Sequence, residues 1–157
     1  MSAAGKQPGP KARTPARAGA GQGKKALRSA SDSAEPPSAD HAALGGTALQ
    51  LRRAKRYDEA LVLYRQAAAA AKAAGDAAAH ATWTSKQGNI HRLLNDPVAA
   101  ERTYRSAFAM FEAIAGAAGL AGLADQEGGL GLVAADQGDD FAAEFAYRRA
   151  VDLAMAA

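Results

Sequence analysis

The sequence predicts an all-α protein, a short α-solenoid of three helix-turn-helix repeats that follows a disordered N-terminal tail. Three observations support this prediction. Alanine, the strongest helix former, accounts for 45 of the 157 residues. The pattern Tyr-Arg-x-Ala occurs three times, beginning at Tyr64, Tyr104 and Tyr147. Residues 1–40 hold five of the six prolines and no aromatic residue, so this segment cannot build a hydrophobic core.

Small residues at fixed distances from each tyrosine define the repeat. An alanine stands four residues before each tyrosine, and another small residue stands twelve residues before that alanine. These positions are Ala60, Ala100 and Ala143, and Ala48, Gly88 and Gly131. Small residues let two helices approach closely while one tyrosine fills the gap between them. Each repeat is therefore expected to be a pair of antiparallel helices.

The first three helices are expected near residues 41–54, 57–74 and 77–94. The first carries Ala48, the small residue of its repeat. In the second, Ala60, Tyr64 and Ala67 are spaced by four and three, which places them on one helix face. Gly75 is expected to close the second helix in a left-handed conformation and Asp76 to cap the third. Trp83, Ile90 and Leu94 form an apolar stripe expected to pack on the preceding repeat.

The last three helices are expected near residues 97–115, 118–136 and 140–156. Asp96 followed by Pro97 is typical of a helix N-terminus. Gly138 is expected to end the fifth helix, and Asp139 or Asp140 to cap the sixth. The fifth helix should be the weakest because each interior glycine costs roughly 0.5–1 kcal/mol relative to alanine. The glycines in this region are Gly116, Gly119, Gly122, Gly128, Gly129 and Gly131.

The positive charge is concentrated in the tail. Residues 1–30 carry seven basic side chains and no acidic one, whereas residues 41–157 carry 12 basic and 13 acidic side chains, a net charge of −1. The basic residues are Lys6, Lys11, Arg13, Arg17, Lys24, Lys25 and Arg28. The tail has three interpretations: a solvated tether, an electrostatic contact with nucleic acid or acidic protein, or an organelle-targeting peptide. Without aromatic residues it would contact phosphates and read no bases.

Several kinds of chemistry are not expected. The chain has no cysteine, which excludes disulfides and thiolate metal sites. His80 and His91 would lie roughly 16 Å apart along one helix, too far to share a metal. Residues 129–134 match a dinucleotide-binding pattern, but no strand precedes them. Ser85 has no nearby histidine with a carboxylate partner, so neither an enzyme nor a cofactor is expected. No apolar run is long enough to span a membrane, and we expect a cytoplasmic protein.

Three further patterns give the sequence a resemblance to a known family. Gly-Asn-Ile-His stands at 88–91, Leu-Gly at 130–131 and Tyr-Asp-Glu-Ala at 57–60, beside the three Tyr-Arg-x-Ala segments. Together these patterns resemble the tetratricopeptide repeat family, in its longer form of about 40 residues per repeat, as in kinesin-light-chain-like adaptors. The resemblance covers residues 41–157, and Thr47-Ala48 departs from the usual Leu-Gly. It implies a non-enzymatic adaptor that holds a protein or peptide partner.

The resemblance also implies a peptide-binding site on the concave surface of the repeats. Thr82, Ser85, Asn89 and Arg92 are spaced three, four and three residues apart, which gives one polar stripe on the third helix. The asparagine amide would hydrogen-bond the backbone of an extended peptide. Arg52 falls in the row of Arg92, so the two would present a basic strip to a carboxylate or an acidic peptide. The alternative is a solvated helix face.

Other functions remain open from the sequence. The first and third repeats offer Gly45, Leu49, Gly128 and Leu132 in the rows of the stripe, so recognition of a C-terminal carboxylate is not expected. The leucines favour a small chaperone, resembling some secretion chaperones, that shields an apolar client segment. In a third reading the basic tail binds nucleic acid or acidic surfaces, and the repeats cluster it.

The sixth helix carries more apolar surface than one partner helix needs. Its apolar residues are Phe145, Val151, Leu153 and Met155. Repeat arrays usually finish with an extra polar capping helix, which does not follow this helix. Self-association or a partner protein is therefore expected there, with a fraying terminal helix as the alternative.

Overall fold

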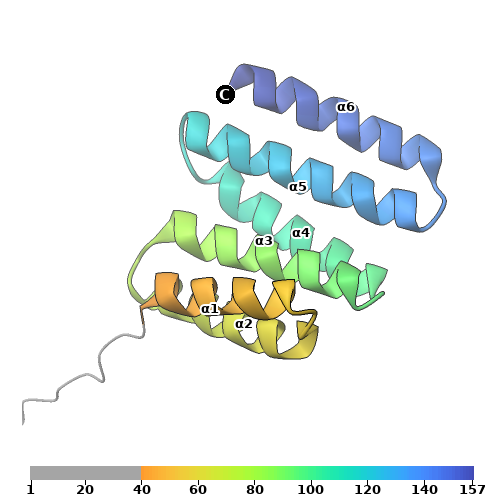
Figure 1. Cartoon of the computed structure of the whole chain (residues 1–157). Coiled ribbons are helices and arrows are strands. Elements are labelled where there is room, and N and C mark those ends of the chain that lie inside the picture. Colours follow the sequence, from red (N-terminus) through yellow and green to blue (C-terminus); the bar gives the residue numbers. More distant parts are fainter. Residues whose placement is uncertain (1–39) are drawn as a thin grey trace, which may run out of the picture. The chain divides into compact units, whose positions relative to one another are not determined.

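The computed structural model describes residues 40–157, which form six helices joined by short loops (Figure 1). The helices are α1 (His41–Arg53), α2 (Tyr57–Ala73), α3 (Ala77–Leu93), α4 (Pro97–Glu112), α5 (Ala117–Asp136) and α6 (Asp140–Ala156). Each helix packs against the next in the chain, and α3 also contacts both α1 and α5. This arrangement confirms the predicted all-α solenoid of three helix pairs. Of the tail predicted for residues 1–40, only Asp40 lies within the described residues.

Aspartates begin four of the six helices. Each accepts a hydrogen bond from a backbone N–H in the first turn, at 2.8–2.9 Å, which satisfies a donor that the helix itself leaves unpaired. The four aspartates are Asp40, Asp76, Asp96 and Asp139. Asp76 and Asp96 were predicted as caps, and of the two candidates for α6 the cap is Asp139. None of the six helices has the length and apolar composition that crossing a membrane requires.

The loops share one backbone device. Gly75 and Gly138 end α2 and α5 with φ of 73° and 78°, as predicted. Lys55 and Asn95 adopt the same left-handed conformation after α1 and α3, with φ of 60° and 58°. Helix α4 ends at Glu112, three residues earlier than predicted, because a four-residue loop with Gly116 at φ 79° leads into α5.

The ring of Tyr104 is held between two glycines from two different helices. A Cβ atom placed on Gly88 of α3 would lie 2.9 Å from the ring, and one placed on Gly129 of α5 would lie 2.5 Å from it. Neither distance is sterically tolerable, so any larger residue would force the helices apart. Tyr104 is 1% exposed. The tyrosine therefore fills the gap within its own repeat, as predicted, and also joins that repeat to the next one.

The tyrosines that correspond to Tyr104 in the other two repeats are packed in a similar way, with different partners. Tyr64 is 1% exposed, packs with Ala48 of α1 and stacks on Trp83 of α3 at a centroid distance of 6.1 Å. Tyr147 lies over Gly131 of α5, but it remains 37% exposed because no further helix in residues 40–157 covers its other face. The buried tyrosines thus depend on the repeat that follows.

Three of the five glycines of α5 have a packing reason. Gly122 lies against Phe111, Gly129 against Tyr104, and Gly131 against Tyr147. Each of these glycines lowers the stability of the helix relative to alanine, but it allows an aromatic ring from α4 or α6 to approach the helix axis. The prediction that α5 is the least stable helix stays a prediction.

Replacing Tyr104 with alanine tests this arrangement. We expect Tyr104→Ala to lower the free energy of unfolding by about 3 kcal/mol, because a buried aromatic ring and its contacts on two helices are lost. Tyr147→Ala, the same change at the same place in the third repeat, should cost only about 1 kcal/mol since the ring is partly exposed. Urea unfolding followed by circular dichroism measures both. Equal losses for the two variants would contradict the role given to Gly129.

Candidate functional site

The predicted polar stripe lies along α3, and its members differ in exposure. Thr82, Asn89 and Arg92 are partly exposed, whereas Ser85 is buried at 8% exposure. The structure therefore leaves Ser85 little surface for contact with a partner. Helix α3 lies between α1 and α5, so side chains from three repeats meet on this surface.

Asn89 is oriented by the core tyrosine of its own repeat. The hydroxyl of Tyr104 donates to Oδ1 of Asn89 at 2.9 Å. The amide oxygen is thus engaged, and the amide nitrogen keeps its two N–H donors. Burial raises the pKa of Tyr104, while the positive charge of Arg92 acts in the opposite direction. At neutral pH the phenol is therefore protonated and remains the donor in this hydrogen bond.

Arg92 forms an ion pair across two repeats. Its Nη1 lies 2.9 Å from Oδ2 of Asp136, at the C-terminal end of α5, and both side chains are partly exposed. Its Nε atom is buried and has no hydrogen-bond partner among the described residues. The basic strip expected from Arg52 and Arg92 is therefore partly neutralised by Asp136.

Arg52 is partly exposed on α1, and no ion pair involves it within residues 40–157. Its charge acts on the phenol of Tyr64, whose pKa is raised by burial and lowered by Arg52. The same relation holds between Arg92 and Tyr104 one repeat later. Arg52 and Arg92 are thus equivalent in the repeat, as expected, but Arg52 is the less neutralised cation.

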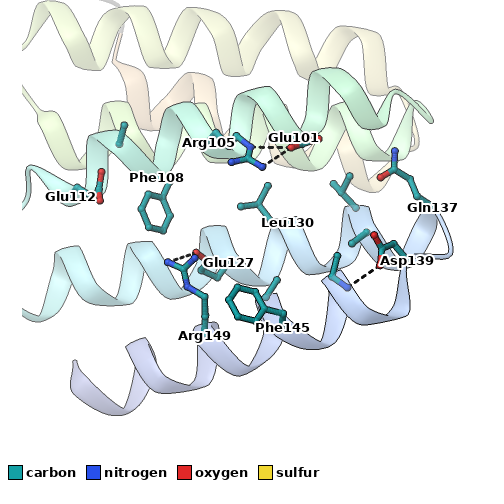
Figure 2. A pocket seen from close by; sticks show the side chains of 15 residues that line it. Glu101, Arg105, Phe108, Glu112, Glu127, Leu130, Gln137, Asp139, Phe145 and Arg149 are labelled. Atoms are coloured by element: carbon teal, nitrogen blue, oxygen red, sulfur yellow. Dashed lines mark hydrogen bonds and ion pairs between the residues drawn. The ribbon is translucent and has the colours of Figure 1, made fainter.

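A second surface, which the sequence did not reveal, is a groove formed by α4, α5 and α6 (Figure 2). We call it the α4–α6 groove. It encloses about 580 Å³, and its apolar lining includes Phe108, Leu130, Val133 and Phe145. Of the candidate binding and self-association residues predicted from the sequence, only Phe145 contributes to it. No sequence signal indicated this groove, because Glu127 is one of three acidic residues in α5, beside Asp125 and Asp136.

An ion pair between a buried carboxylate and a half-exposed guanidinium crosses this groove from α5 to α6. Oε1 of Glu127, whose side chain is 6% exposed, lies 3.0 Å from Nη2 of Arg149. The Arg149 guanidinium also lies over the ring of Phe145, 5.9 Å from its centroid, which favours a cation–π contact. Figure 2 shows these three side chains together, facing Phe108 and Leu130. A second pair, Glu101 with Arg105, borders the groove on α4.

The apolar residues predicted for self-association do not share one surface. Phe145 faces the α4–α6 groove, Leu153 is partly buried, and Met155 is 82% exposed. Val151 belongs to a third hollow on α6, of about 600 Å³, which we call the outer groove. Its lining residues are Ala135, Asp140, Ala143, Glu144, Tyr147, Arg148, Val151 and Asp152. Within residues 40–157 no cluster of three histidine, aspartate or glutamate side chains could hold a metal ion.

Comparisons with known proteins identify the repeats. Residues 41–113 match the family model described as tetratricopeptide repeat. The crystal structure of BtubC (BKLC) from P. vanneervenii has a similar fold, with a TM-score of 0.64 and 19% sequence identity. The match covers 72% of this chain and 46% of that chain, so this chain spans about half the length of BtubC. No curated protein matches the sequence. The resemblance inferred from the sequence is thus confirmed.

The pair formed by Glu127 and Arg149 provides a test of the α4–α6 groove. In a double-mutant cycle with Glu127→Ala and Arg149→Ala, we expect a coupling energy of about 1–2 kcal/mol, because the carboxylate is buried and the guanidinium half-exposed. The cycle for Glu144 and Arg148, both largely exposed on α6, serves as the control and should give about 0.3–0.5 kcal/mol. Urea unfolding of the variants supplies the energies. Similar coupling in both cycles would show that the buried position adds nothing.

The raised pKa of Tyr104 predicts how stability depends on alkaline pH. The phenol stays protonated to a higher pH in the folded state than in the unfolded chain, where its pKa is about 10. Its contribution to stability is therefore complete below pH 10 and is lost as pH rises through the folded-state value. Unfolding free energies measured between pH 8 and 11 should fall more steeply for the wild type than for Tyr104→Phe. Parallel curves would contradict this assignment.

Proposed function

We propose that the protein is a non-enzymatic adaptor that binds an extended peptide or protein segment on the surface of α1, α3 and α5, a proposal supported by the match of residues 41–113 to the tetratricopeptide repeat model. Repeats of this family generally mediate protein–protein interactions. The observation that carries the proposal is the fixed amide of Asn89. It lies on the central helix of this surface and is held by Tyr104, which packing has already immobilised.

The hydrogen bond from Tyr104 gives Asn89 a defined role. Since the amide oxygen accepts from the phenol, the amide nitrogen is the group left to contact a ligand. An extended peptide presents backbone carbonyl oxygens that can accept from it. Little rotamer entropy is lost on binding because the amide is already oriented. The site therefore selects a backbone in extended conformation.

The neighbouring side chains suggest the chemistry of the bound segment. Arg92 is already paired with Asp136, so an acidic ligand would have to compete with that carboxylate. Arg52 on α1 is the better partner for an acidic side chain. Leu132 on α5 is 38% exposed and offers an apolar contact in the third repeat. We propose a ligand with an acidic residue toward α1 and an apolar residue toward α5.

A small chaperone is the second candidate function, and the α4–α6 groove favours it. Phe108, Leu130 and Phe145 line this groove, and such a surface could shelter an apolar client segment. The basic tail gives a third role, binding of nucleic acid or acidic surfaces, with a domain boundary near residue 40. That role rests on the seven basic residues of 1–30, which lie outside the described part of the chain.

The adaptor function is tested by replacing Asn89 with leucine, the residue that both other repeats carry in this row as Leu49 and Leu132. Peptides selected from a random display library on the full chain should bind Asn89→Leu at least about tenfold more weakly, a loss of about 1.4 kcal/mol. Fluorescence anisotropy of labelled peptides measures the affinities. Gln66→Leu, on an exposed position of α2, is the matched control and should bind as the wild type does.

The alternatives give different results in the same assay. Undiminished binding by Asn89→Leu, with loss in Phe108→Ser, would overturn the adaptor site in favour of the apolar groove. Binding that disappears on deletion of residues 1–39 and in moderate salt would assign the activity to the tail.

A further inference from the structure

The outer groove on α6 has the chemistry of a helix-docking surface. Tyr147 and Val151 are 37% and 56% exposed, and no helix in residues 40–157 covers them. Asp140 and Glu144 border the N-terminal half of the groove. On α4, the equivalent surface is covered by α5. The contact between α4 and α5 therefore indicates what kind of helix would dock in the outer groove.

Helices α4 and α6 repeat the same side chains 43 residues apart. Tyr104 of α4 corresponds to Tyr147 of α6, and the intrahelical pair of Glu101 with Arg105 recurs as Glu144 with Arg148. On α4, the ring of Tyr104 packs against Gly129 of α5, and Val133 of α5 belongs to the same hydrophobic cluster. A helix that docks on α6 in the same way must therefore place a small residue over Tyr147.

Helix α1 carries such a residue at the corresponding position. The repeats are offset by 43 and then 40 residues, so the place of Gly129 in the third repeat falls on Gly46 in the first. Gly46 is exposed, and no atom lies within 4 Å of a Cβ added there. Its neighbours on this face, Ala43 and Gln50, are exposed as well. The first helix thus presents an open, small-residue face in the register that accepts a tyrosine ring.

The charges at the helix ends match. Consecutive helices in the array run antiparallel, so an α1 docked in this way would place its C-terminal end beside the N-terminal end of α6. The former carries the exposed basic residues Arg53 and Lys55, and the latter the acidic residues Asp140 and Glu144. Opposite charges in this position attract, and the attraction decreases with salt.

We propose that the occupant of the outer groove is α1 of a second copy of this chain, with Gly46 of one copy over Tyr147 of the other. The contact is head-to-tail, since it joins different surfaces of the two copies, and it leaves a free α1 and a free α6 at the ends of every assembly. Such a contact produces linear oligomers whose length increases with protein concentration. It is weaker than the α4–α5 contact because Gln50 stands where Val133 packs on Tyr104.

A variant pair tests this contact through sedimentation velocity of the full chain from about 1 μM to about 1 mM, the range of weak associations. Gly46→Leu blocks the α1 face, and leucine is a good helix former at this exposed position. Val151→Glu blocks the outer groove. Each variant alone should stay monomeric where the wild type forms species larger than a dimer. An equimolar mixture should form a heterodimer that grows no further, since each variant keeps one intact surface.

Matched controls carry the same changes elsewhere. Gly128→Leu places leucine on another glycine with open space around it, and Val62→Glu changes a valine of similar exposure on α2. Both should associate as the wild type does. A dimer that survives Gly46→Leu would overturn the proposal in favour of symmetric α6–α6 pairing. A wild type that stays monomeric over the whole range, or controls that fail equally, would also overturn it.

Discussion

The fold depends on one contact, the insertion of a tyrosine ring into the space that a glycine leaves on a neighbouring helix. Tyr104 shows it most completely, since Gly88 of its own repeat and Gly129 of the following repeat lie on either side of the ring. The close approach of three helices follows from this contact, and so does the fixed position of the phenol hydroxyl. That hydroxyl orients Asn89, so the packing of the core determines the geometry of the candidate binding surface.

The fold was predictable because its determinants are local or repeat at a fixed spacing. Three columns of small residues and tyrosines gave the number of helix pairs, and aspartate caps and glycines gave most helix ends. The left-handed conformation of Lys55 escaped prediction because the loop imposes it and lysine has no preference for it. Asn95 is a residue type that adopts this conformation more readily, so its place after α3 carried a signal that the sequence analysis did not use. The early end of α4 follows from the four-residue loop before α5. The repeat spacing of 43 reflects the length of α5, which has 20 residues where α3 has 17.

The candidate site was predictable only in part. A helical period places Thr82, Ser85, Asn89 and Arg92 on one stripe, but it gives no information about partners from other helices. The contacts of Tyr104 with Asn89, Arg92 with Asp136, and Glu127 with Arg149 all join different helices. These contacts depend on the distance between neighbouring helices and on the rotation of each helix about its axis. The spacing of residues within one helix does not determine either quantity. For the same reason the sequence gave no sign of the α4–α6 groove.

The dependence of each tyrosine on the following repeat has a consequence for biosynthesis. Tyr104 leaves the ribosome 25 residues before Gly129, since synthesis proceeds from the N-terminus. Until α5 has emerged, the ring of Tyr104 can pack only on Gly88 of α3, and the side of α4 that α5 covers remains accessible to water and to other chains. A repeat therefore completes its packing only after the first helix of the next repeat has been synthesised. A pause in translation between α4 and α5 would extend the period in which the nascent chain can aggregate or recruit chaperones.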